Sequence, residues 1–286
     1  MVTDSVPEAQ PGGFAERVRQ RSRAIRSWLC IGLDPDPTKF PPKVPRTAAG
    51  ISQFCQEIIQ ATQDFAVCFK INSAFFEAFG SAGWKALEDV RAGIPQSIPV
   101  ILDSKRGDIG NTATAYAKAV FEALNADAAT VNPFLGWDSL QPFLEYGGRG
   151  VLVLCRTSNP GSRDFQQLEI QGEPLYLRVA REALQQRVPA DVGLVVGATH
   201  PDALERVRRL DEEIIILAPG VGAQGASVAQ AVRAGSNSNG DNLLASASRD
   251  ILYPSSRGAP ADEARRVAEL WAGESWRVKE HDGAPA

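Results

Sequence analysis

The sequence predicts a single-domain (β/α)₈ barrel of the TIM type, and three observations support this fold class. Short apolar, β-branched segments alternate with segments of helical character along the chain. There are eight such apolar segments, and each is apolar almost throughout, as in a parallel sheet buried on both faces. The length of 286 residues suits one barrel domain. An open doubly wound sheet is the structural alternative.

Each predicted strand is followed by a predicted helix, in the order that a barrel requires. The strands are expected at 29–34, 66–72, 99–103, 129–133, 150–155, 193–199, 214–219 and 242–246. The helices are expected at 51–63, 73–93, 111–124, 139–145, 175–187, 201–210, 227–234 and 260–271. The barrel domain is expected to span 14–272, between a disordered N-terminal extension (1–13) and a C-terminal tail (273–286).

Composition excludes several classes of protein. The chain is 44% hydrophobic and carries a formal net charge of −4, which argues against general nucleic-acid binding because that function needs a basic surface. The first residues lack the apolar core of a signal peptide, and no apolar stretch is long enough to span a bilayer. We therefore expect a cytoplasmic protein with no membrane partner.

The cysteines and histidines do not suggest a metal centre. Cys30, Cys55, Cys68 and Cys155 form no CxxC pair, and three of them lie in apolar segments that are predicted strands. They are expected to be small buried side chains in a reducing compartment. Because the chain has two histidines, a zinc site is not expected.

The strongest chemical signal is the segment 100–112, in which an apolar strand leads directly into Asp103, Lys105 and Asp108, and Thr112 opens the next helix. Side chains two residues apart on a strand point the same way, so Asp103 and Lys105 are expected to project together. Barrel enzymes place their chemistry at this carboxyl end of the strands. The alternative is a surface salt-bridge cluster in which Asp108 caps the helix.

Two neighbouring strands also end in charged residues. Lys70 interrupts the apolar segment 66–72, where an unpaired lysine would be costly, so a carboxylate partner in the Asp103, Lys105 and Asp108 group is implied. Asp34 ends the first strand in the same way. Three adjacent strands that end in charge at the same mouth indicate a functional site.

A glycine-rich loop follows the seventh strand at 218–225 and matches GxGxxG. Its context is wrong for a dinucleotide-binding fold, where the motif follows the first strand. Glycines still allow backbone N–H groups to approach a phosphate, and barrels often bind phosphate after strands seven and eight. Arg249 follows the eighth strand, where it could bind the phosphate or be a surface arginine.

The long loop 157–174 is either a segment that covers the substrate or a tolerated insertion.

Together these motifs resemble the orotidine 5′-phosphate decarboxylase family, in particular its longer bacterial (type 2) subgroup. The resemblance runs over about 14–253 in family order and is most specific at the strand-three motif. The matching features are Asp103-x-Lys105-x-x-Asp108-Ile109-x-x-Thr112, Lys70, Asp34, Ser158-Asn-Pro-Gly161, Pro219 and Gln224 of the glycine loop, and Arg249. The long loop after Cys155 departs from the shorter family members.

The resemblance implies a carboxy-lyase that converts orotidine 5′-phosphate to UMP and CO₂ in de novo pyrimidine biosynthesis. Lys105 would stabilise the C6 carbanion and then protonate it, and Asp103 would hold Lys105 charged and oriented beside the departing carboxylate. Lys70 and Asp108 would complete an alternating series of lysines and aspartates that titrates as a group.

The resemblance also implies a set of binding residues. Asp34, Lys70, Asp108 and Thr112 would surround the ribose hydroxyls, with Asp108 and Thr112 reaching into the neighbour's site across a homodimer interface. Ser158 would contact the pyrimidine, and Gln224 and Arg249 would hold the phosphate beside Pro219. The family needs no metal or organic cofactor.

Three other functions stay open. The sugar-phosphate branch of the same superfamily, including 3-hexulose-6-phosphate synthase, shares the D-x-K-x-x-D motif but uses Mg²⁺ to stabilise an enediolate. A Schiff-base aldolase could use Lys70 or Lys105, although the acids flanking Lys105 favour its ammonium form. The third is a nucleotide-binding barrel without catalysis.

Overall fold

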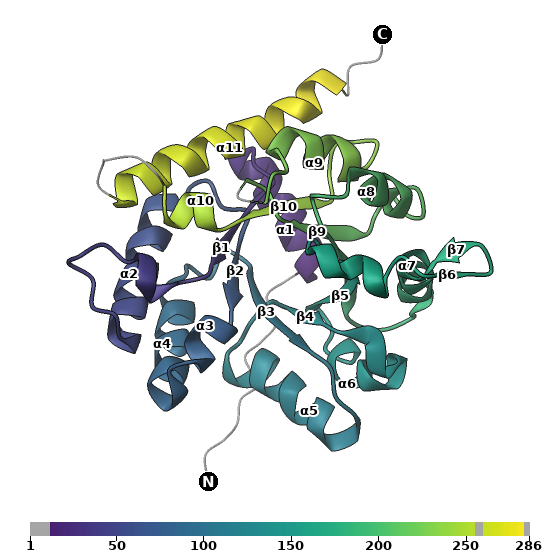
Figure 1. Ribbon diagram of the computed structural model, residues 1–286, viewed down its shortest axis with the longest axis horizontal. Helices are drawn as coiled ribbons and strands as arrows, with labels where there is room; N and C mark the ends of the chain where they lie inside the picture. Colours follow the sequence, from purple (N-terminus) through teal and green to yellow (C-terminus); the bar gives the residue numbers. More distant parts are fainter. Residues whose placement is uncertain (1–11, 223, 255–259, 283–286) are drawn as a thin grey trace.

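The computed structural model describes residues 12–222, 224–254 and 260–282, and within these ranges eight parallel strands close into a barrel (Figure 1). They are β1 (Leu29–Leu33), β2 (Cys68–Asn72), β3 (Val100–Arg106), β4 (Ala128–Val131), β5 (Gly150–Arg156), β8 (Asp191–Val196), β9 (Ile215–Pro219) and β10 (Leu243–Ala247). Each strand pairs with the next along the chain, and β10 closes the barrel by pairing with β1. The predicted (β/α)₈ fold is confirmed.

Helices cover the outer faces of the barrel strands and one end of the barrel (Figure 1). They are α1 (Phe14–Ile25), α2 (Ala48–Thr62), α3 (Ala74–Glu77), α4 (Gly80–Gly93), α5 (Gly110–Lys118), α6 (Gln141–Leu144), α7 (Leu175–Gln185), α8 (Pro201–Arg208), α9 (Val228–Gly235), α10 (Arg249–Leu252) and α11 (Pro260–Asp282). Local sequence sets several of their starts: Thr47 caps α2, and Ser227 with Gln230 forms a capping box on α9. None of the described helices combines the length and apolar character that a membrane crossing requires.

Three segments differ from the sequence prediction. The helix expected at 73–93 is divided into α3 and α4, because Gly80 adopts a φ of +58° that breaks the helical path. The loop 157–174 contains a short hairpin, β6 (Glu169–Ile170) with β7 (Glu173–Pro174). The last helix does not end at 271 but continues to Asp282, through most of the expected tail; the buried Ser275 accepts a hydrogen bond from the Trp28 backbone N–H (3.0 Å).

The barrel interior is filled by alternate residues of the strands, as the period of two requires. The inner cluster contains Cys30, Cys68, Ile101, Ala128, Leu152, Val195, Ile215, Leu217 and Leu244. Lys70, Asp103 and Thr130 each lie two residues after an inward-facing member of this cluster. Their side chains therefore also point into the barrel. The apolar core therefore gives way to a polar layer at the carboxyl ends of the strands.

Helix α1, which the sequence analysis did not predict, covers the opposite end of the barrel. Phe14 and Val18 are fully buried and belong to the inner cluster. Gly150 at the start of β5 leaves room for the Phe14 ring, since a Cβ at Gly150 would lie 2.5 Å from it. Only residues 1–11 of the extension predicted to be disordered lie outside the described residues.

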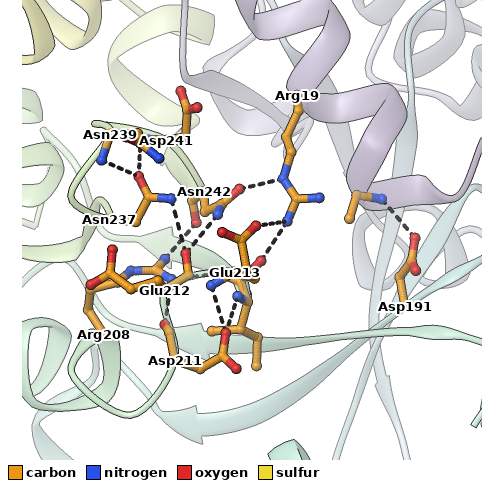
Figure 2. A network of polar contacts seen from close by, with 12 residues as sticks. Arg19, Asp191, Arg208, Asp211, Glu212, Glu213, Asn237, Asn239, Asp241 and Asn242 are labelled. Atoms are coloured by element: carbon orange, nitrogen blue, oxygen red, sulfur yellow. Dashed lines mark hydrogen bonds and ion pairs between the residues drawn. The ribbon is translucent and has the colours of Figure 1, made fainter.

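Polar contacts attach α1 to the starts of three strands, as Figure 2 shows. The backbone N–H of Ala15 donates to Asp191 (2.9 Å) at the start of β8. The guanidinium of Arg19 donates to the side chain of Asn242 (2.7 Å) and to the backbone carbonyl of Glu213 (2.6 Å), which precede β10 and β9. These bonds fix α1 across the amino ends of the strands.

A buried arginine supports the same end of the barrel (Figure 2). The guanidinium of Arg208, at the end of α8, donates to the backbone carbonyls of Gly235, Asp211, Ile214 and Asn242. These carbonyls lie at the end of α9 and in the segments that lead into β9 and β10, where buried backbone oxygens need hydrogen-bond donors. This network therefore stabilises the face of the barrel opposite the polar layer, as is usual for the amino-terminal face of a barrel.

All four cysteines are buried and free, as predicted. Cys30 and Cys68 face each other in the paired strands β1 and β2, in the layer below Lys70. They pack as small apolar side chains.

Replacing Phe14 with alanine should lower the free energy of unfolding by about 3–5 kcal/mol, because a large ring is lost from the end of the core and leaves a cavity. Urea unfolding at pH 7 measures the change. The control is Gln20→Ala on the exposed face of the same helix, which should change stability by about 0.5 kcal/mol or less. Equal effects of the two substitutions would show that α1 does not close the core.

Candidate active site

A pocket of about 350 Å³ opens at the carboxyl ends of the strands. Its size is that of a small-molecule site. It is lined by Asp34, Lys70, Asn72, Asp103, Lys105, Thr130, Leu154, Thr157, Ser158, Asn159, Val195, Leu217, Pro219, Gly220, Val221, Gln224, Ser246, Ser248 and Arg249. Eight of the ten site residues expected from the sequence, all except Asp108 and Thr112, therefore line one pocket.

Four charged residues at one end of the pocket form what we call the Lys/Asp cluster: Asp34, Lys70, Asp103 and Lys105. The ammonium of Lys70 donates to Oδ2 of Asp103 (2.9 Å), and that of Lys105 donates to Oδ1 of Asp103 (2.6 Å). Asp34 lies 3.7 Å from the Lys70 ammonium. The salt-bridge partner that the sequence implied for Lys70 is thus Asp103.

The backbone of β3 is irregular where it carries this cluster. Leu102 pairs with Ala129 and Arg106 with Val131, so residues 103–105 of β3 face one residue of β4, Thr130. Lys105 takes a φ of +49°, in the left-handed region that costs a residue with a side chain about 1–2 kcal/mol. Simple strand alternation would have predicted the shared direction of Asp103 and Lys105 but not this bulge.

Thr130 is a site residue that the sequence analysis missed. Its hydroxyl accepts a hydrogen bond from the backbone N–H of Lys105 (3.0 Å) and donates one to Oδ1 of Asp103 (2.9 Å). Its position in the sequence could have indicated an inward-facing polar side chain, because Thr130 lies two residues after the inward-facing Ala128 on an otherwise apolar strand.

Lys70 and Asp103 are held in their charged forms by electrostatic attraction within the cluster. Burial disfavours the Lys70 ammonium, which is 4% exposed, but the carboxylates of Asp103 and Asp34 outweigh burial and raise the pKa of Lys70 above its usual value. Burial likewise disfavours the Asp103 carboxylate, but Lys70 and Lys105 outweigh it and lower the pKa of Asp103. At neutral pH Lys70 and Asp103 therefore form an ionised pair inside the pocket.

Asp34 has an unused hydrogen-bonding atom. Its Oδ1 is buried 3.7 Å from the Lys70 ammonium, and among the described residues it accepts no hydrogen bond. The loop that carries it is tied down by Tyr253, whose hydroxyl accepts from the backbone N–H of Asp36 (2.6 Å). A buried carboxylate oxygen without a donor is a suitable acceptor for a hydroxyl group of a bound molecule.

The loops after β9 and β10 build another part of the pocket, and they are adjacent because Pro219 pairs with Ser246. Gly220 and Gly222 have φ values of +101° and +78°, and a Cβ at Gly222 would lie 2.1 Å from the Asp250 carboxylate. Only glycine fits there. Arg249 lines the pocket beside this loop, and among the described residues no carboxylate pairs with it. This part of the pocket can therefore accept an anion.

Ser158 lines the pocket from the loop after β5, which packs closely against the loop after β8. A Cβ at Gly197 would lie 2.7 Å from the Ser158 Cα, so the absence of a side chain at Gly197 lets the two loops approach each other. Asn159 and Thr157 line the same wall, where the sequence had pointed to the serine alone.

Asp108 and Thr112 lie outside the pocket of this chain. Asp108 is half-buried and accepts from the backbone N–H of Ile109 (2.8 Å), and Thr112 is exposed on α5. Neither residue caps α5, whose N-cap position is Ile109.

The closed barrel, with its charged pocket at the carboxyl ends of the strands, defines a TIM-barrel enzyme. The chain belongs to the Orotidine 5′-phosphate decarboxylase / HUMPS family, whose sequence model matches residues 27–266. An orotidine 5′-phosphate decarboxylase from Roseiflexus sp. (strain RS-1) is 49% identical over 259 residues, which are 90% of this chain and 94% of the relative. The family resemblance seen in the sequence is confirmed.

Solved structures agree with this assignment. The structure of Leishmania donovani OMP decarboxylase has a TM-score of 0.83 and 40% identity, and the match covers 94% of this chain and 99% of that one. The structure of Leishmania donovani UMP synthase has a TM-score of 0.82 and 42% identity over 92% of this chain, which spans 57% of that longer protein.

The substitution Asp103→Asn should lower the free energy of unfolding by about 3–5 kcal/mol at pH 7, because it leaves the buried Lys70 ammonium poorly compensated. Urea unfolding measures the loss. Asp89→Asn is the control: Asp89 pairs with Lys85 at 2.9 Å on the exposed face of α4, where water screens the interaction, so stability should hardly change.

Within the intact protein, the stability that this pair contributes should not vary between about pH 5 and 9. The lowered pKa of Asp103 keeps its contribution complete above the ordinary value of about 3.9, and the raised pKa of Lys70 keeps its contribution complete below about 10.4. A difference between wild type and Asp103→Asn that disappears at pH 7 would contradict this pairing.

Proposed function

We propose that this chain converts orotidine 5′-phosphate to UMP and CO₂, the carboxy-lyase step of pyrimidine biosynthesis, with Lys105 as the proton donor. The observation that carries the proposal is the 2.6 Å ion pair between Lys105 and Asp103, located in a pocket that also offers glycine backbone and Arg249. Family membership and the names of the relatives support the same reaction.

The reaction needs a cation beside C6 of the pyrimidine. The bond from C6 to the carboxylate breaks, its electron pair stays on C6, and CO₂ leaves. The Lys105 ammonium stabilises this charge and then transfers a proton from Nζ to form the new C6–H bond. The Lys105 side chain is 48% exposed, so it can regain a proton from water after product leaves.

Asp103 and Lys70 prepare the donor for this step. Asp103 fixes the Lys105 ammonium through Oδ1, while its Oδ2 is held by the buried Lys70. Because both partners are fixed before substrate arrives, little reorganisation is needed during the reaction. Asp34 and Lys70 are assigned to the ribose hydroxyls; the assignment is supported by the buried Asp34 Oδ1, which accepts no hydrogen bond among the described residues.

The remaining pocket residues bind the parts of the substrate that do not react. Ser158 is assigned to the pyrimidine, and Gln224 and Arg249, beside Pro219, to the phosphate. Phosphate binding far from C6 can supply energy that lowers the barrier at the reacting carbon.

The Mg²⁺-dependent sugar-phosphate reaction is the alternative within the same family. In this chain both oxygens of Asp103 accept hydrogen bonds from lysine ammonium groups, which competes with their use as metal ligands. The cofactor-independent decarboxylation therefore fits the cluster better.

A homodimer is part of the proposal, with Asp108 and Thr112 completing the partner's site. The segments after β3 and β4 lie together, since the backbone N–H of Asn132 donates to the carbonyl of Arg106 (2.8 Å). They expose apolar side chains: Ile109 is 61%, Phe134 78% and Leu135 52% exposed. An exposed apolar patch beside two site residues that lie outside this chain's own pocket supports association with a second copy.

A cytoplasmic location is also part of the proposal, and the four free thiols support it.

Purified protein should consume orotidine 5′-phosphate in the presence of EDTA, and Lys105→Ala should lower kcat by about 1,000-fold or more. Loss of substrate absorbance measures both rates, and circular dichroism checks the fold. The control is Lys85→Ala, an exposed lysine on α4. No turnover by the folded wild type sinks the decarboxylase proposal, and activity that requires Mg²⁺ establishes the alternative.

Lys105→Ala and Asp108→Ala should complement each other if the site is shared. Each variant alone is expected to be inactive, whereas mixed dimers, purified through two different tags, should recover about half of the wild-type activity because one of their two sites is intact. Mixed dimers as inactive as the parent variants would place Asp108 outside the partner's site.

A further inference from the structure

Thr130 forms hydrogen bonds with both the backbone and a charged side chain of the Lys/Asp cluster. It is 1% exposed and faces the pocket from the inner side of β4. Its hydroxyl accepts from the Lys105 backbone N–H (3.0 Å) and donates to Oδ1 of Asp103 (2.9 Å), the same oxygen that accepts from the Lys105 ammonium (2.6 Å). One hydroxyl therefore contacts both ends of the Lys105 residue, directly at the backbone and through Asp103 at the side chain.

The bulge explains why a side chain is needed here. Between the pairs Leu102–Ala129 and Arg106–Val131, three residues of β3 face Thr130 alone, so regular ladder bonding is interrupted. The Thr130 hydroxyl takes the place of a strand carbonyl as the acceptor for the Lys105 N–H. Lys105 is left-handed at φ +49°, a conformation that persists only when its surroundings hold it.

The two bonds require a group that accepts and donates at the same time. A threonine or serine hydroxyl can do both, whereas valine, which has the shape of threonine, can do neither. Loss of the hydroxyl would leave the Lys105 N–H without its acceptor and would remove one of the three hydrogen bonds that orient the Asp103 carboxylate. The Lys105 ammonium would then lose its fixed place beside the substrate.

We propose that Thr130 is a positioning residue of this active site: its hydroxyl fixes the left-handed backbone of Lys105 and the orientation of Asp103, and so places the proton donor. This inference rests on the proposed decarboxylation. It assigns to β4 a role in catalysis through Lys105 and Asp103, distinct from substrate binding by the loops after β9 and β10.

The test compares Thr130→Val, Thr130→Ala and Thr130→Ser by steady-state kinetics with orotidine 5′-phosphate. Thr130→Val and Thr130→Ala should lower kcat by about 10- to 100-fold, because small misplacement of a reacting group has effects of this size. KM should change by less than about 3-fold, since the phosphate end of the pocket is untouched. Thr130→Ser keeps the hydroxyl and should keep kcat within about 3-fold of wild type.

The matched control is Thr62→Val, which removes another fully buried threonine hydroxyl, bonded to the Ile58 carbonyl within α2. It should leave kcat and KM unchanged, while thermal unfolding reports its stability. If Thr130→Val fails to fold, Thr130→Ala and Thr130→Ser still separate the hydroxyl from the methyl group. Wild-type kcat without the hydroxyl, or equal losses in Thr130→Ser and Thr130→Ala, would overturn the inference. An inactive wild type would instead overturn the proposed function.

Discussion

The carboxylate of Asp103 is the constraint on which the active site depends. Lys70 enters the inner face of an apolar barrel, where an isolated ammonium could not stay charged. Asp103 compensates it with one oxygen and holds Lys105 with the other. The same carboxylate thus makes the buried lysine tolerable and places the exposed lysine in the pocket. Stability and catalysis are coupled through one side chain, because both lysines donate hydrogen bonds to it.

The barrel divides the remaining tasks between its two ends. At the amino ends of the strands, α1 and the Arg208 network complete the core and satisfy loop carbonyls. At the carboxyl ends, the inward positions become polar, and the chain accepts a bulge and a left-handed lysine. Local strain of this kind is tolerated because the packed core below it and the hydrogen bonds around it hold the geometry. The packed core and the amino ends of the strands therefore support the strained backbone at the carboxyl ends.

Much of this arrangement could be predicted from the sequence, and the failures have physical causes. Eight apolar segments, of which the first three end in charged residues, were enough to place Asp34, Lys70, Asp103 and Lys105 at one mouth of the barrel, because parallel strands align their carboxyl ends. Thr130 was missed because a threonine in a strand is ordinary, and its role depends on a bulge in the neighbouring strand that no sequence period reveals. Helix α1 and the end of α11 were missed because tertiary packing of Phe14 and Ser275, more than local pattern, explains them.

If an ammonium group at position 105 performs the chemistry, restoring that group chemically to an inactive variant should restore activity. Lys105→Cys should be inactive, and alkylation of the folded variant with 2-bromoethylamine should return an ammonium to nearly the same place. The reagent should be selective, because the four native cysteines are buried whereas the Lys105 side chain is 48% exposed. The account predicts that decarboxylation of orotidine 5′-phosphate returns with alkylation, and that wild type treated in the same way is unchanged. A folded variant that mass spectrometry shows to be alkylated at position 105, yet still inactive, would contradict it.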